Sequence, residues 1–264
     1  FVVKGIEAWN KAFEKAGFKN AIVAKIQPDD ADWDAGDVRY NVVRWASTPD
    51  PRYSGYGPSV ANPRTGEIIA ADIVQEFNAI KRGYSYRKLW GYSEDNDPLE
   101  QWIISLTMHE VGHTLGLRHN FKSSWVFDAK EVHDVTITGD NHIGSVMDYD
   151  PINLAPKGIP QGNYFPTGPG SYDIWAIEFG YTPGLTDEDR ESLLSKSTEP
   201  EYIFGTDGDA MSSPGINIDP RNYRGDMSND PITYTADRIE TIDAKILELP
   251  DIYLIDGKTS TEFR

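Results

Sequence analysis

Three of the five histidines in this chain lie within one short segment, HEVGHTLGLRH, at positions 109–119. Residues four apart on an α-helix share one face and lie about 6 Å apart along its axis. His109 and His113 can therefore point imidazole nitrogens at a single metal ion. Glu110 is turned about 100° around the helix from His109, so it flanks the ion, where a general base belongs.

A glycine in the same segment supplies a route to a third ligand. Gly116 can adopt a positive φ and end the helix sharply, which allows the chain to bring His119 to the same ion. Three protein ligands leave one coordination position open, as in catalytic zinc sites. A surface pair of helical histidines is the alternative interpretation. The additional glycine and histidine at fixed offsets make a chance match rare in a chain with so few histidines.

Two motifs carry a resemblance to a known clan. HEVGHTLGLRH resembles the metzincin metalloprotease signature H-E-x-x-H-x-x-G-x-x-H at every defining position. Downstream, SVMDY at 145–149 resembles the metzincin Met-turn, whose methionine forms an apolar floor under the metal. The resemblance implies a site with three zinc ligands, a general base, a floor residue and an assisting tyrosine: His109, His113, His119, Glu110, Met147 and Tyr149.

The resemblance implies a zinc-dependent endopeptidase that hydrolyses peptide bonds with a metal-activated water and Glu110 as base. Tyr149 would be a fifth zinc ligand or an oxyanion donor, and a packed aromatic after a turn is its alternative interpretation. A protein or peptide substrate would lie extended along an edge strand within 57–75. Asn120 follows the third histidine, where better-known families carry Glu, Pro, Ser or Asp, so no subfamily specificity carries over.

Two other functions stay open at this point. The first is a catalytically silent module that keeps the fold to bind peptide or glycan, which would predict loss of a ligand or of the base. All four of those residues are present, which favours the enzyme. The second is hydrolysis of a non-peptide amide, because the metal chemistry is the same.

Composition excludes several classes of protein and of site. The chain has 25 Lys and Arg against 42 Asp and Glu, a net charge of −17, which argues against a nucleic-acid partner. There is no cysteine, so disulfides and thiolate metal sites are excluded. No apolar run is long enough to span a membrane. We expect a secreted, periplasmic or cell-surface protein, and a chain that is part of a longer polypeptide with further domains.

The elements that must position these residues can be read from the pattern of apolar and turn residues. Apolar spacing predicts a helix over 2–16 and another that begins at Pro98 and carries the histidines. The other predicted elements are strands at 20–27 and 37–47, two short strands around a turn in 57–75, and helices at 171–181, from Thr186 and from Pro231.

The resemblance and these elements together predict an α+β metzincin-like fold with a twisted mixed sheet and an active-site helix. We expect a catalytic domain over 1–185 and a helical and loop extension over 186–264 packed on it. His133 and His142 are expected in loops, away from the metal. Asp207 and Asp209 could form part of a calcium loop, but a solvated acidic turn is the favoured interpretation because an EF-hand's spacing and glutamate are missing.

Overall fold

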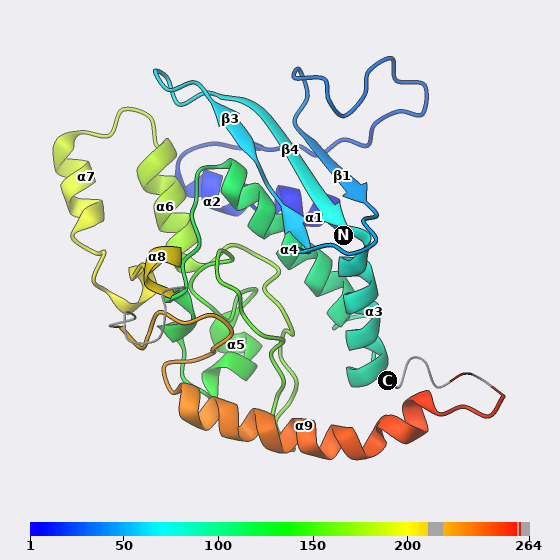
Figure 1. Ribbon diagram of the computed structural model, residues 1–264. Helices are drawn as coiled ribbons and strands as arrows, with labels where there is room; N and C mark the ends of the chain where they lie inside the picture. The colour runs from blue at the N-terminus through cyan, green and yellow to red at the C-terminus, as the bar shows by residue number, and fades with distance from the viewer. Residues whose placement is uncertain (211–218, 258, 260–264) are drawn as a thin grey trace.

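The computed structural model describes residues 1–210, 219–257 and 259. A mixed sheet forms one layer, and a long buried helix, α4, crosses beneath it through the centre of the molecule (Figure 1). The described helices are α1 (Val2–Glu7), α2 (Asn10–Lys15), α3 (Phe77–Trp90), α4 (Pro98–Thr114), α5 (Val135–Thr138), α6 (Ser171–Tyr181), α7 (Asp187–Leu194), α8 (Asp207–Ala210) and α9 (Pro231–Tyr253). Short 3₁₀ turns occupy Ser123–Val126, Glu131–His133 and Pro200–Tyr202.

The sheet is built around one long strand, β4 (Ile68–Glu76). On one side β4 pairs in parallel with β1 (Val42–Ala46). On the other side it pairs antiparallel with β2 (Gly55–Tyr56) near its end and with β3 (Ser59–Ala61) near its start. The strands β2 and β3 therefore form one broken edge of the sheet. This mixed sheet with its set of helices confirms the predicted fold class.

Helix α4 begins with strong start signals and is buried on nearly every face. The Asp97 carboxylate caps it by accepting a hydrogen bond from the Leu99 amide at 3.0 Å, and Pro98 occupies the first helical position. Arg87 of α3 forms an ion pair with the same Asp97. From the sheet, the Gln75 amide donates a hydrogen bond to the Thr107 hydroxyl at 2.7 Å. These contacts fix the rotation of α4 about its own axis.

The C-terminal end of α4 is closed by the predicted glycine. Gly116 has a φ of +93°, and its amide donates to the carbonyl of His113 at 3.0 Å. The Leu117 amide donates to the carbonyl of Gly112, also at 3.0 Å. This pair of bonds is a Schellman motif, which satisfies the last helical carbonyls and reverses the chain.

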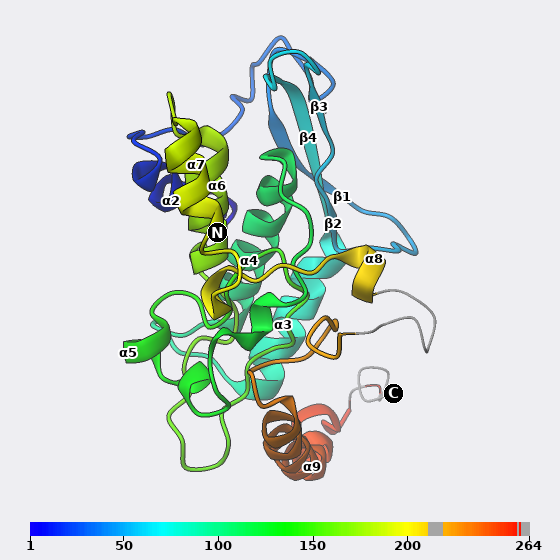
Figure 2. The same cartoon turned by 90° about the vertical axis from the view of Figure 1, so that its left-hand side faces the viewer.

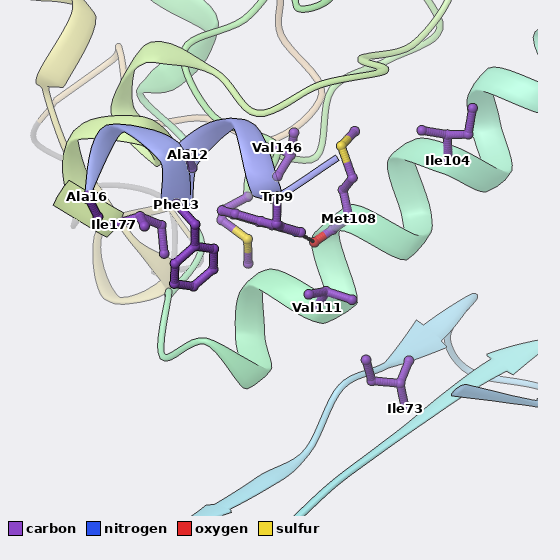
Figure 3. Close-up of a cluster of buried hydrophobic side chains, with 11 residues drawn as sticks. Trp9, Ala12, Phe13, Ala16, Ile73, Ile104, Met108, Val111, Val146 and Ile177 are labelled. Carbon is purple, nitrogen blue, oxygen red and sulfur yellow. Dashed lines mark hydrogen bonds between the residues drawn. The ribbon is translucent and has the colours of Figure 1, made fainter. Parts of the chain in front are cut away.

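A hydrophobic core lies behind α4 and includes residues from the first helices, the sheet, α4 and α6. Trp9 is fully buried, and its indole NH donates to the Met108 carbonyl at 3.0 Å, which ties the N-terminal helices to α4 (Figure 3). The other buried members are Ala12, Phe13, Ala16, Ile73, Ile104, Val111, Val146, Met147 and Ile177. Val146 and Met147, which follow α4 in the chain, are thus packed on the same core as the helix itself.

The C-terminal elements lie on the outside of this arrangement. Helix α6 packs beside α2 and α7 lies beyond α6, while α9 runs along the far end of the molecule from the sheet (Figures 1 and 2). The indole NH of Trp175 in α6 donates to the Leu193 carbonyl of α7 at 3.0 Å. The predicted helices at 171–181, from Thr186 and from Pro231 are all present, and Thr186 forms a capping box with Asp189. No helix among the described residues is long and apolar enough to cross a membrane.

Some sequence-based expectations were wrong. The helix predicted over 2–16 is two short helices, and β1 covers only the second half of the predicted strand 37–47. The segment 20–27 is not a strand, because side chains bind its backbone: Asn10 bonds Ile22 and Glu7 bonds Ala24. Helix α3 is not predicted, because its segment is mixed and polar, with charged residues among the apolar ones.

Replacing Gly116 with alanine should lower the free energy of unfolding by about 1–2 kcal/mol, because an L-residue is strained at this φ. Gly180→Ala is the control, since Gly180 lies in α6 without a positive φ, and a methyl group added there would meet no described atom. That control should stabilise the helix by up to about 1 kcal/mol. Urea unfolding measures both values, and equal effects of the two substitutions would contradict the assigned helix end.

Candidate metal centre

The end of α4 brings the three predicted histidines together. His109 and His113 lie one turn apart on the helix, with ring centroids 4.8 Å apart. After the reversal at Gly116, the ring of His119 lies 4.8 Å from that of His113 and 5.3 Å from that of His109. One nitrogen from each ring lies within 4.8 Å of the others, which is close enough for a single ion to reach all three.

Each imidazole is held by a hydrogen bond at Nδ1, so the three Nε2 atoms are left to bind one metal ion. The acceptors are the Val146 carbonyl for His109 at 2.8 Å, the Leu117 carbonyl for His113 at 3.0 Å, and Asp207 Oδ1 for His119 at 2.9 Å. An Nδ1–H that donates to a carbonyl or carboxylate fixes the tautomer with a lone pair on Nε2. The three hydrogen bonds are the outer layer of interactions that metal-binding histidines usually make.

The three histidine side chains fit a zinc ion, because they are largely buried and have nitrogen atoms free to bind it. The Nε2 of His119 is buried and has no hydrogen-bond partner among the described residues. Burial, together with the neighbouring His113, lowers the pKa of His109 to about 3, and burial also lowers the pKa of His113. Both rings are therefore neutral near pH 7, the form that binds metal. Three imidazole nitrogen donors suit zinc, which readily accepts imidazole ligands.

Glu110 lies beside this group in a dry environment. Only 4% of its surface is exposed, and burial raises the pKa of its carboxyl group to about 8. The backbone of the sheet edge packs directly on it: a methyl group added to Gly55 would collide with the Glu110 carboxylate, and one added to Gly57 with the Glu110 carbonyl. A nearby cation favours the ionised carboxylate, so a metal ion at the three histidines would make Glu110 a base at neutral pH.

The segment SVMDY packs against α4 and lies beside the histidines. Met147 is fully buried, and a methyl group added to Gly112 of α4 would collide with its sulfur. The segment is clamped by Asp173 of α6, whose carboxylate accepts hydrogen bonds from the Ser145 hydroxyl at 2.5 Å and the Val146 amide at 2.8 Å. Because Val146 also holds His109, this clamp acts on the metal centre through one intervening residue.

Tyr149 borders the open side of the histidine cluster. Its ring centroid lies 4.6 Å from that of His119 and 5.4 Å from that of His109, and 44% of its surface is exposed. Burial, followed by the charges of Glu110 and Asp207, raises the pKa of its hydroxyl group. The hydroxyl therefore stays protonated at neutral pH and can donate a hydrogen bond.

The structure does not bring the other two histidines to this centre. His133 is buried and stacks on Tyr234, with ring centroids 5.9 Å apart. His142 is also buried, with its Nε2 3.5 Å from Asp150 Oδ2. Calcium gains no support, because the histidine triad is the only cation-binding group of His, Asp and Glu found in the described ranges.

The sequence does not predict two residues that position the site although they lie far from it in the chain. Asp173 lies in the first turn of an ordinary helix, and nothing in the sequence around it signals a bond to residues 145 and 146. The sequence around Asp207 predicts an acidic turn, whereas the structure makes Asp207 the partner of His119. Both contacts join segments far apart in the chain, so local spacing carries no signal for them.

Asp173→Asn should lower the free energy of unfolding by about 3 kcal/mol. The Asp173 carboxylate accepts hydrogen bonds from three buried donors, whereas an asparagine amide has only one acceptor oxygen, so the substitution leaves buried donors without a partner. The control is Glu178→Gln on the same helix, whose carboxylate forms a surface pair with Lys15 at 3.8 Å. That control should change stability by less than about 1 kcal/mol. Denaturant unfolding of the metal-free variants tests the difference, and a loss no larger than that of the control would rule out the clamp.

Comparison with known proteins agrees with this geometry. Residues 92–264, well over half of the chain, match a protein family described as Met-zincin. No curated protein and no solved structure gives a significant match. The matched range contains the whole histidine motif, the SVMDY segment and the described C-terminal elements. With this match over most of its length and three histidines assembled around one point, the chain belongs to the Met-zincin family.

Proposed function

We propose that the chain is a zinc-dependent endopeptidase. The observation that carries the proposal is the convergence of three imidazoles whose Nδ1 atoms are all occupied, so that only Nε2 atoms face the shared point. A surface cluster of histidines would have no reason to be held in this way. Membership of the Met-zincin family supports a metallopeptidase type of activity at this centre.

Zinc bound at this centre supplies a Lewis acid, which polarises a substrate carbonyl and acidifies water. Glu110 then accepts the proton of the attacking water and delivers it to the leaving amine. Its burial suits that role, since a carboxyl group with a pKa near neutral can both take up and release a proton. The position of Glu110 one residue after His109 keeps its carboxylate beside the ligands and outside their shared point.

The residues around the open side have supporting roles in the proposal. Tyr149 donates its hydroxyl hydrogen to the oxyanion that develops on the substrate carbonyl, where a fixed donor is worth most. Met147 serves as the apolar floor of a Met-turn. Its complete burial against Gly112 supports that role, because it keeps water and other polar groups from beneath the ligands.

The sheet edge beside Glu110 suits an extended peptide. Strand β3 (Ser59–Ala61) is exposed at all three residues, and β2 precedes it along the same edge. Gly55 of β2 lies against the Glu110 carboxylate, so a peptide added to this edge would run past the catalytic base. Backbone pairing recognises a peptide without regard to its ends, which favours internal cleavage over the removal of terminal residues.

The direct test compares the protein with its Glu110→Gln variant. We expect the zinc-loaded protein to cleave casein or an internally quenched peptide library, and the variant to lose about 10²–10⁴-fold of that rate, the usual contribution of a general base. Zinc content should stay at one ion per chain, because Glu110 is not a ligand. Glu100→Gln provides a control on the same helix, since Glu100 is paired with Lys4 outside the histidine group and its variant should keep full activity.

Binding of a peptide hydroxamate separates the enzyme from a silent binding module. Both the wild-type protein and Glu110→Gln should bind the hydroxamate through the bound zinc. Full activity in Glu110→Gln would disprove the role of the base. Stoichiometric zinc with neither hydroxamate binding nor peptide cleavage would instead favour the silent peptide- or glycan-binding module.

A further inference from the structure

The third histidine differs from the other two in the origin and charge of its partner. His109 and His113 are held by backbone carbonyls of Val146 and Leu117. His119 is held by a carboxylate, Asp207 Oδ1 at 2.9 Å, which lies in the C-terminal part of the chain at the start of α8. The described residues thus contain one acidic side chain that contacts the triad at Nδ1, and it comes from 88 positions away in sequence.

Asp207 is delivered to His119 by a segment that is tied to the end of the histidine motif. The side chain of Asn120 donates to the Ile203 carbonyl at 3.0 Å and accepts from the Gly205 amide at 3.1 Å. The Phe121 amide donates to the Gly205 carbonyl at 2.7 Å. Asn120 is fully buried, so these bonds are shielded from water. The segment 203–207 is therefore docked along 119–121, the residues that follow the reversal of the chain.

The Asp207 carboxylate is itself held in place. Its second oxygen accepts a hydrogen bond from the Thr206 hydroxyl at 3.2 Å, and the Thr206 carbonyl accepts from the Asn222 side chain, also at 3.2 Å. The Asp207 side chain is 37% exposed while that of His119 is 16% exposed. A surface ion pair does not explain this contact, because the other nitrogen of His119 is buried and has no partner among the described residues.

We propose that Asp207 is a positioning residue of the metal centre and that Asn120 docks the segment that carries it. A carboxylate that accepts from Nδ1–H fixes the ring and raises the basicity of Nε2, so it strengthens His119 as a ligand. The acidic turn at 206–210 thereby becomes part of the site, and the C-terminal region completes the zinc centre. The inference rests on the zinc binding in the proposed function and does not depend on peptide hydrolysis.

The test measures zinc affinity by chelator competition for the full chain and for Asp207→Ala, Asp207→Asn and Asp209→Ala. Asp209 is exposed on the same short helix. Asp209→Ala therefore removes one negative charge, as Asp207→Ala does, but leaves the contact between Asp207 and His119 in place. Asp207→Ala should raise the zinc dissociation constant about 10–100-fold, while Asp209→Ala stays within about twofold of wild type. Asp207→Asn should have a smaller effect than alanine, because its amide oxygen can still accept the bond but carries no charge.

A second readout separates positioning from folding. Cobalt(II) substituted for zinc should give a shifted visible absorption band in Asp207→Ala and an unchanged band in Asp209→Ala, since the band reports the ligand field and not stability. If wild type binds zinc and both Asp207 variants match Asp209→Ala in affinity and spectrum, the role of Asp207 is disproved while the zinc centre stands. If wild type binds no zinc, the proposed function fails and this inference fails with it.

Discussion

Three hydrogen bonds at Nδ1 are the interactions on which the metal centre depends. An imidazole that is free to rotate or change tautomer presents either nitrogen in a range of directions, and three such rings rarely point at one place. Here each ring is fixed at Nδ1, by Val146, by Leu117 or by Asp207. The convergence of the Nε2 atoms follows from where the chain places these three acceptors, and most of the fold can be understood as the means of placing them.

The acceptors are placed by three different devices. The Leu117 carbonyl is local, since the Schellman motif at Gly116 turns it back toward His113. The Val146 carbonyl belongs to a segment that is buried on the core and clamped by Asp173. The Asp207 carboxylate arrives from the C-terminal region through the docking of residues 203–205 on Asn120. Loss of the Asp173 clamp or of the docking on Asn120 should leave the other two rings held, whereas loss of the reversal at Gly116 would displace His119 as well as the acceptor of His113.

Burial of the site sets its electrostatics. The pKa values of His109 and His113 are lowered, and that of Glu110 is raised to about 8, all mainly by loss of water. The uncharged form of each group is therefore the stable one near pH 7 without a bound cation. A divalent cation reverses the preference for Glu110 while using the neutral histidines as they are. The same loss of water strengthens every interaction with charge that develops during a reaction.

The parts of the site that could be predicted are those that depend on local geometry. The spacing of His109 and His113, the helix start at Pro98 and the reversal at Gly116 all follow from the dimensions of one helix and its ends. The contacts of Asp173 and Asp207 could not be predicted, because each depends on how distant segments pack. The absence of a strand at 20–27 has the same origin: its strand-like pattern is present, but side chains of the first helices bind its backbone.

Extended X-ray absorption fine structure at the zinc edge of the zinc-loaded protein is the most direct test of the three-histidine centre, since it reports the atoms around the ion without reference to activity. We predict one zinc per chain with three imidazole nitrogens at about 2.0–2.1 Å and a light-atom ligand from water in the fourth position. The outer-shell scattering typical of imidazole should weaken by about one third in His119→Ala, because one of three rings is lost. A spectrum with fewer than three imidazoles, or one unchanged by loss of His119, would contradict the convergence of the three rings on a single ion.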